Sequence, residues 1–306
     1  MERQFDIPKT VFFISALFSG LIVILIFGFI FHTAAPVLMK EGFGFLIGTE
    51  WNYDESKFGI LPFLCGTLFM TAVTMVFACP IGVGTAIYLA EWAPAWIEKP
   101  VSTMIELLVG IPSVIFGIFG FFVLEPIFRD TINPFIGNTL GFIPIFAYNT
   151  QGNGLGILLA STILAIMVLP TIVGLSREAM QKIPQEYREA SLSIGATSWE
   201  TIRHVIIPAA LPGIITAFIL ALMRAMGETM AVVMLIGSTN RIPTSILDTG
   251  NAMTSKILSD IGYWLSFPEP TSALFAIGAV LFLIEMIFVA IARLVSSRMV
   301  IARQGR

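Results

Sequence analysis

Long apolar runs separated by shorter polar stretches dominate the chain. Each of the six longest runs approaches or exceeds the roughly 20 residues that a helix needs to cross about 30 Å of hydrocarbon. The pattern predicts an all-α, polytopic membrane protein with six transmembrane helices, and an even number of spans places both termini on the same side. The six segments cover residues 11–35, 61–90, 101–128, 154–177, 211–236 and 272–295.

Composition agrees with this fold class and argues against a soluble domain and a nucleic-acid-binding protein. Of the 306 residues, 56% are hydrophobic and only 12% are charged, whereas a soluble domain carries about 25% charged residues. The net charge of -3 comes with no basic stripe, so the chain is not expected to bind nucleic acid. The membrane lipid is its expected surroundings.

Lysine and arginine fall mostly on one side of the predicted spans, which sets the orientation. By the positive-inside rule, the richer side, with both termini and the 178–208 loop, is cytoplasmic. The protein is thus expected to be a multi-pass protein of the cytoplasmic (inner) membrane. The cations assigned to the inside are Arg3, Lys9, Lys99, Arg177, Lys182, Arg188, Arg203, Arg293, Arg298, Arg303 and Arg306, and those assigned to the outside are Lys40, Lys57, Arg129, Arg241 and Lys256.

The 178–208 loop has the pattern of two short helices with a break at Gly195. Pro184 suits the first turn of the first helix. Thr197 with Glu200 three residues later forms a capping-box pattern that starts the second. Pro208 and Pro212 are then expected to turn the chain back into the bilayer.

Two interpretations of this loop are open. An amphipathic hairpin could lie on lipid, but such helices usually carry a polar face rich in lysine and arginine. Here Glu186, Glu189 and Glu200 are mixed with Arg188 and Arg203. Interspersed charges, small residues and an apolar face favour docking into the groove of a protein partner.

Four charged residues lie well inside the apolar segments: Glu106, Arg224, Glu228 and Glu285. A charge at bilayer depth costs at least about 2.5–3.5 kcal/mol, so each needs a partner or a water-lined cavity. Glu106 lies near the start of its segment and is also compatible with a solvated helix end. Glu285 is expected to pair with a neighbouring helix.

Arg224 and Glu228 are four residues apart and share one helix face if the helix is continuous. They could neutralise each other as a structural ion pair. Alternatively, Arg224 faces a cavity and binds an oxyanion through its planar fork. Glu228 would then accept the O–H of hydrogen phosphate and repel sulfate, which has no such proton at neutral pH.

The polar loop resembles the EAA loop of type I ABC importer permeases. The similarity rests on Glu189-Ala190-Ser191, on Gly195, and on the later Ile207-Pro208 and Leu211-Pro212 pairs, with Ser191 where the family more often has alanine. The resemblance implies that the loop is a coupling helix seated in a cleft of a separate ATPase, with Glu189, Ala190, Ser191 and Gly195 taking part in the coupling.

The chain is also similar to the phosphate-specific, PstC-type branch of that family. The similarity rests on residues 106–117, 224–231, 49–52 and 57–68. It implies a PstA-type permease partner, two PstB-type ATPase subunits, and a PstS-type external protein that delivers phosphate. It also implies that Arg224 and Glu228, with Glu106 as a further candidate, take part in binding the substrate.

These observations divide the chain into residues 1–61, an N-terminal transmembrane helix with an outer loop, residues 62–300, the permease core, and a cytoplasmic tail, 301–306. The glycines at 152–156 lack the Lys-Ser/Thr of a nucleotide-binding loop. We therefore expect a transport subunit that is not an enzyme and binds no cofactor, with ATP-Mg used by the partner ATPase. The alternatives are a permease for molybdate, sulfate or phosphonate, and a stand-alone secondary anion transporter.

Overall fold

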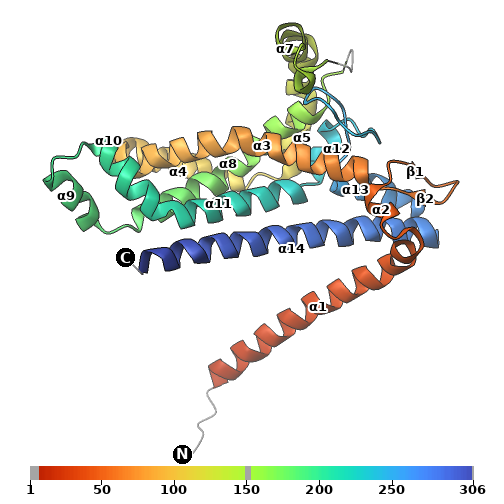
Figure 1. The fold of residues 1–306 in the computed structure, drawn as a ribbon, viewed down its shortest axis with the longest axis horizontal. Helices are drawn as coiled ribbons and strands as arrows, with labels where there is room; N and C mark the ends of the chain where they lie inside the picture. Colours follow the sequence, from red (N-terminus) through yellow and green to blue (C-terminus); the bar gives the residue numbers. More distant parts are fainter. Residues whose placement is uncertain (1–6, 149–152, 305–306) are drawn as a thin grey trace, which may run out of the picture.

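The computed structural model describes residues 7–148 and 153–304, and nearly all regular structure in these ranges is helical (Figure 1). Two short strands pair in an antiparallel hairpin, with Trp51 opposite Phe58. The elements are α1 (Ile7–Glu41), α2 (Gly44–Ile47), β1 (Trp51–Asn52), β2 (Lys57–Phe58), α3 (Leu61–Ile87), α4 (Ala95–Val109), α5 (Ser113–Phe119), α6 (Glu125–Ile127), α7 (Asn133–Leu140), α8 (Ile157–Gln181), α9 (Gln185–Ser193), α10 (Ser198–Thr201), α11 (Ile207–Gly227), α12 (Met230–Leu235), α13 (Met253–Trp264) and α14 (Pro268–Gln304).

Within the described residues, five helices are long and apolar enough to cross a membrane, and a bent pair brings the number to six if it counts as one span. The prediction of an all-α, multi-pass protein is confirmed. The five are Pro8–Glu41, Leu61–Trp92, Ile157–Gln181, Ser198–Gly227 and Pro268–Ile291. α9 and α10 lie at one end of the bundle, and the β1–β2 hairpin lies at the other (Figure 1). We call these the coupling-loop end and the hairpin end.

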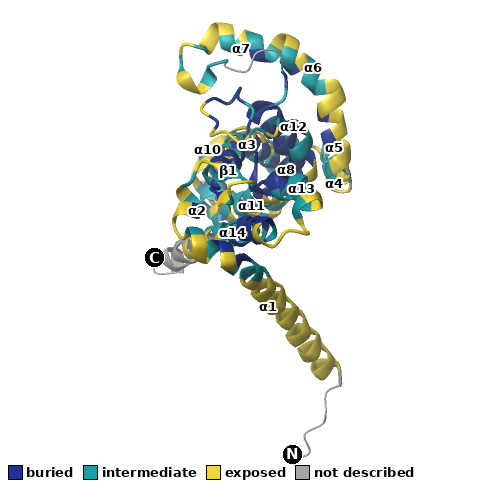
Figure 2. Ribbon diagram, turned by 90° about the vertical axis from the view of Figure 1, so that its right-hand side faces the viewer, coloured by how far each residue is buried: buried dark blue, intermediate teal, exposed yellow. Residues whose placement is uncertain are grey.

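The third predicted span is not one straight helix. α4 ends at Val109, and the chain turns by 95° before the run that starts at Ser113. Pro112 explains the break, because it has no N–H to continue the helix and biases the residue before it away from helical angles. α5, α6 and α7 then run along one exposed edge of the molecule (Figure 2).

Four π-helical turns interrupt the described helices: Tyr88–Trp92, Gly120–Leu124, Phe128–Ile132 and Ile202–Ile206. Each turn ends two residues before a proline, namely Pro94, Pro126, Pro134 and Pro208. The proline ring clashes with the carbonyl four residues earlier and cannot donate to it. A wider turn moves that carbonyl away, which explains the π turns before Pro126, Pro134 and Pro208, where helix continues through the proline. After the first π turn the helix ends instead, because Ala93 and Pro94 are extended.

The core of the bundle is the packing of α3 against α8, with α11 across both. Small residues permit the close approach of α3 and α8, because a Cβ on Gly82 would lie 2.6 Å from the Ile172 side chain. The Ser161 hydroxyl donates to the Met70 carbonyl across the contact at 3.0 Å. Such small-residue contacts and interhelical hydrogen bonds associate helices where no hydrophobic effect drives them together.

α1 and α14 touch near the hairpin end and then separate. Ser272 accepts a hydrogen bond from the Val37 N–H at 3.2 Å, and Phe29 packs edge-on against Phe275. The first half of α1 extends away from the bundle with its apolar side chains exposed (Figures 1 and 2). In a bilayer this surface contacts lipid or another membrane helix.

A buried lysine fastens the hairpin to α13. The Lys256 ammonium pairs with Asp260 at 2.6 Å and lies 5.3 Å from the ring centres of both Trp51 and Phe63. The Tyr53 hydroxyl donates to the same Asp260 carboxylate. Burial, helped by that hydrogen bond, raises the pKa of Tyr53, so the hydroxyl remains a donor at neutral pH.

Candidate functional site

The 178–208 loop forms two helices, α9 and α10, joined at Gly195. Gly195 has φ +89, a left-handed conformation that other residues rarely adopt. The predicted capping box is present: Thr197 Oγ1 accepts from the Glu200 N–H at 3.3 Å, and Glu200 accepts from the Thr197 N–H at 2.8 Å. The Glu200 carboxylate accepts from both the N–H and the hydroxyl of Thr197, and these two hydrogen bonds hold the pKa of the Glu200 carboxyl below its ordinary value.

Arg188 holds α9 against the coupling-loop end of the bundle. Its guanidinium bonds Glu91 twice, at 2.7 and 3.2 Å, and donates to the carbonyls of Ile183 and Met180. The Arg188 and Glu91 side chains are 17% and 9% exposed. A largely buried pair with its remaining donors satisfied fixes the position of the helix.

The predicted coupling residues divide into one that is buried and three that are exposed. Ser191 is buried and shares a hydrogen bond of 2.9 Å with Thr201 of α10. Glu189, Ala190 and Gly195 are exposed. Ser191 therefore joins the two short helices, while the other three residues lie on the free surface of the loop.

Large apolar side chains on the same loop are also exposed: Tyr187 (54%), Leu192 (48%), Ile194 (85%) and Trp199 (50%). Of the residues of α9, only Ser191 is buried. An exposed apolar surface that is held rigidly from behind is typical of a protein-docking site.

The prediction that Pro208 and Pro212 turn the chain is wrong. Helical structure continues from Ser198 through a π turn to Gly227, and both prolines lie within it. The π turn at Ile202–Ile206 accommodates Pro208. The second helix of the loop, α10, and Arg224 are consequently parts of one long rod, with α10 at its first turn and Arg224 in its last.

Arg224 is partly exposed, in the last turn of α11. A cation is favoured there by the negative end of the helix dipole. Within residues 7–148 and 153–304, no carboxylate lies within ion-pair distance of it, and it makes no ion pair with Glu228. Twelve residues separate it from Pro212, which is about 18 Å of helix.

Glu228 does not continue the helix of Arg224. α11 ends at Gly227, Glu228 is extended (ψ 130), and α12 starts at Met230. Its Oε1 accepts from the N–H groups of Thr229, Met230 and Ala231 at 3.1, 3.1 and 3.4 Å. The predicted 211–236 span is therefore broken beside Arg224, and the Glu228 carboxylate caps the helix after the break.

Other groups converge on this break. The Thr254 hydroxyl of α13 donates to the Glu228 carbonyl at 2.8 Å. Glu285 of α14 approaches from another side, since a Cβ on Gly227 would lie 3.6 Å from Glu285 Oε1. The expected ion pair of Glu285 is absent among the described residues, and Glu106 on α4 is exposed.

Sequence reasoning missed two contributors to these sites. Glu91, the partner of Arg188, is 97 residues away along the chain, and no local pattern connects the two. The capping role of Glu228 had a local signal, because an acidic residue directly before a new helix start is typical of an N-terminus.

Comparisons with known proteins agree with this architecture. The profile of the family described as binding-protein-dependent transport system inner membrane component matches residues 82–301. The phosphate transport system permease protein PstC of Xylella fastidiosa (strain 9a5c) is 38% identical over 264 residues, 86% of this chain and 81% of that protein. The PstC protein of Mesorhizobium japonicum is 35% identical, over 99% of this chain and 94% of its own length.

A solved structure supports the fold. A bacterial ABC transporter involved in the import of the acidic polysaccharide alginate superposes with a TM-score of 0.56 at 17% identity, covering 97% of this chain and 99% of that chain. At this identity the likeness concerns the fold alone. The family profile matches most of the chain, and the two PstC relatives are 38% and 35% identical over at least 86% of it. The chain therefore belongs to the family of binding-protein-dependent transport system inner membrane components.

Proposed function

We propose that this chain is the PstC-type permease subunit of an ATP-driven importer that moves inorganic phosphate across the cytoplasmic membrane by alternating access. A permease of this family is a transport subunit and not an enzyme, and it works with a separate ATPase and a substrate-binding protein. Three relatives that are 32–38% identical over most of the chain, from Xylella fastidiosa, Mesorhizobium japonicum and Haemophilus influenzae, are named as phosphate transport system permease proteins, which supports phosphate as the cargo.

The observation that carries the proposal is Arg224. It is a cation in a membrane-spanning helix, beside a helix break, with no carboxylate within ion-pair distance in the described part of the chain. Such a charge is expensive in a membrane unless a cavity or a ligand accompanies it. The planar guanidinium fits two oxygens of a phosphate group.

The expected partners are a PstA-type permease, two PstB-type ATPase subunits and a PstS-type phosphate-binding protein. Both termini and the coupling loop are assigned to the cytoplasm from the positive-inside rule. The exposed surface of α9 and α10, with Glu189, Ala190 and Gly195, is the docking surface for the ATPase, which uses ATP-Mg; this subunit binds no cofactor of its own. The apolar half of α1 contacts membrane lipid or the partner permease.

In this mechanism the motor moves the coupling loop, and the continuous helix from Ser198 to Gly227 carries the motion to Arg224. The loaded binding protein docks on the hairpin end while ATP closes the motor. The cavity opens outward, phosphate binds at Arg224, and hydrolysis returns the cavity to the inward state. Transport requires that Arg224 hold phosphate more tightly in one state than in the other.

The test is reconstitution of this chain with its partner permease and ATPase subunits in proteoliposomes, with ATP inside and loaded binding protein outside. Radiolabelled phosphate should accumulate, and it should not do so when the ATPase subunits are omitted. Uptake that persists without them would make the chain a secondary transporter. Accumulation of molybdate, sulfate or phosphonate in preference to phosphate would reassign the cargo.

A further inference from the structure

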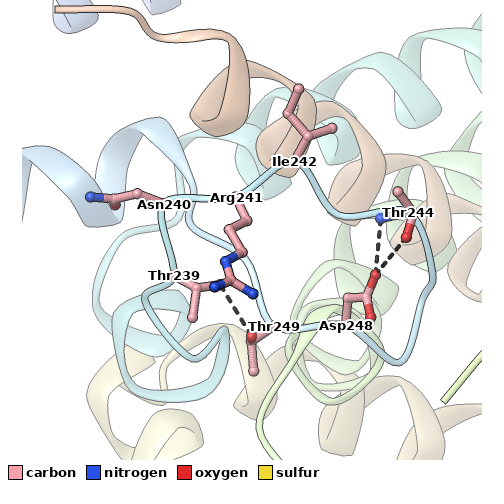
Figure 3. Close-up of a pocket in the computed structure, with 7 residues that line it drawn as sticks. All are labelled: Thr239, Asn240, Arg241, Ile242, Thr244, Asp248 and Thr249. Atoms are coloured by element: carbon pink, nitrogen blue, oxygen red, sulfur yellow. Dashed lines mark hydrogen bonds between the residues drawn. The ribbon is translucent and has the colours of Figure 1, made fainter. Parts of the chain in front are cut away.

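The connection between α12 and α13 encloses a second polar site that the mechanism above does not use. A pocket of about 670 Å³ opens there, lined by Thr239, Asn240, Arg241, Thr244, Asp248 and Thr249 (Figure 3). The volume is within the range of small-molecule sites. In Figure 3 the Arg241 side chain points from its loop toward Thr239 and Thr249, whose hydroxyls share a hydrogen bond of 3.1 Å.

The backbone around the pocket is fixed by hydrogen bonds. The Thr239 N–H donates to Gly250 at 2.9 Å, and the Ile246 N–H donates to Ile145 at 2.9 Å. Asp248 Oδ2 accepts from the N–H and hydroxyl of Thr244, each at 3.0 Å, so this carboxylate oxygen is engaged by the loop itself. The pocket is therefore formed in advance, which lowers the entropic cost of binding a ligand.

Arg241 differs from the other cations assigned to the outer side. Four of the five are ion-paired: Lys40 with Glu269 (3.1 Å), Lys57 with Glu55 (2.8 Å), Arg129 with Asp130 (2.9 Å) and Lys256 with Asp260 (2.6 Å). Arg241 has no ion pair within residues 7–148 and 153–304. Among the residues that the structure describes, the outer cation without a carboxylate partner is thus the one that lines this pocket.

Along the chain, one short helix, α12, joins the pocket to the break beside Arg224. α12 starts at Met230, where Glu228 caps it, and ends at Leu235, shortly before the pocket residues begin at Thr239. Six residues of helix span about 9 Å. Arg224 and Arg241, which make no ion pair among the described residues, therefore flank one short helix along the chain, six residues before its start and six residues after its end.

We propose that this pocket is an outer anion site that receives inorganic phosphate from the docked binding protein before phosphate reaches Arg224. The inference rests on the proposed function. The guanidinium fork of Arg241 donates to two phosphate oxygens, and the Thr239 and Thr249 hydroxyls supply further polar contacts. Because Arg241 is exposed, its hold on phosphate is weak enough for the ion to move on, as stepwise conduction requires.

The experiment uses the assembled importer in proteoliposomes and measures uptake of radiolabelled inorganic phosphate together with ATP hydrolysis stimulated by loaded binding protein. In Arg241→Gln, phosphate moved per ATP hydrolysed should fall about 10- to 100-fold, because charge-assisted hydrogen bonds are lost. Stimulation of the ATPase should be unchanged. Arg241→Lys, which keeps the charge but not the fork, should lie between the two.

Arg129→Gln is the matched control, since it removes the same guanidinium from the side assigned to the outside, but outside the pocket and outside the β1–β2 hairpin. Both readouts should stay at the wild-type value. Wild-type uptake in Arg241→Gln would overturn the proposal. Loss of ATPase stimulation in that variant would also overturn it, because Arg241 would then contact the binding protein itself. If the wild-type importer moves no phosphate, the proposed function fails, whatever the variants do.

Discussion

Arg188 and Arg224 lie on the same stretch of chain but are in opposite electrostatic situations. Arg188 donates to a carboxylate and two backbone carbonyls, and both members of its ion pair are largely buried. Arg224 has no ion pair among the described residues and is partly exposed at the end of α11. The hydrogen-bond donors of Arg188 are used within the protein to hold α9 in place, whereas the guanidinium of Arg224 is available to a ligand. Their removal should therefore have different consequences.

The largest expected effect is that of Arg224→Gln on transport. Loss of a charged hydrogen-bonding partner costs about 2–5 kcal/mol, so phosphate uptake should fall by about 30-fold or more. Assembly and thermal stability should be unchanged, because no partner is left unpaired. Uptake by the reconstituted importer and its melting temperature measure the two effects. Normal uptake would remove Arg224 from the site, and a large loss of stability would show that it has a structural partner.

Arg188→Gln should have the opposite effect: it should lower stability and assembly rather than the binding of phosphate. It leaves the Glu91 carboxylate buried without its cation, which costs about 3–5 kcal/mol. The melting temperature and the amount of assembled protein should fall, and any phosphate transport that remains should keep its apparent affinity. The double variant Arg188→Leu/Glu91→Leu should recover much of the stability. If the single variant is as stable as the wild type, the Arg188–Glu91 ion pair does not anchor α9.

Gly195→Val tests the link between the two arginines. No atom lies within 4 Å of a Cβ at this position, so the cost is backbone strain of about 1–2 kcal/mol. We expect α9 and α10 to change their relative orientation, with ATP hydrolysis several-fold less coupled to uptake. Gly195→Asn, which tolerates the left-handed conformation, should remain coupled. Gly174→Ala, at another glycine with open space around it, should behave as the wild type.

The smallest effect is expected from Glu228→Gln. The amide oxygen can still accept N–H groups of α12, so the loss of stability should be at most about 1 kcal/mol. Selectivity is the informative measurement. If the carboxylate also accepts the proton of hydrogen phosphate, sulfate should compete several-fold better in the variant. Unchanged competition would leave Glu228 with the capping role alone.

The features that could be predicted from the sequence are those with local causes. The apolar segments are set by the thickness of the bilayer, and the Thr197–Glu200 capping box involves residues three apart. The breaks at 110–112 and 228–229 lie inside apolar runs, where hydropathy gives no signal and only Pro112 and Glu228 mark them locally. At the second break a distant group satisfies the backbone, since the Thr254 hydroxyl donates to the Glu228 carbonyl.

The candidate site shows the same limit. The four charges inside apolar segments were found because a buried charge is rare in a membrane. Which of them lie together depends on how α11, α13 and α14 pack, and this brought Glu285 beside Gly227 but left Glu106 exposed. Nothing in the sequence indicated that Arg241 belongs to a binding site, because an arginine in a polar loop is common. It stands out only in the structure, where the other cations assigned to the outside are ion-paired.

The π turn at Ile202–Ile206 has a consequence for the length of the chain. A π turn holds one residue more than the α-helix around it, without changing the direction of the flanking segments. A homologue one residue shorter within 202–206, and lacking Pro208, would present Arg224 on the same face of the rod. The same deletion between Gly213 and Arg224 would turn the arginine by about 100° around the helix axis. In alignments of related chains, we therefore expect one-residue gaps within residues 202–206 and none between residues 213 and 224.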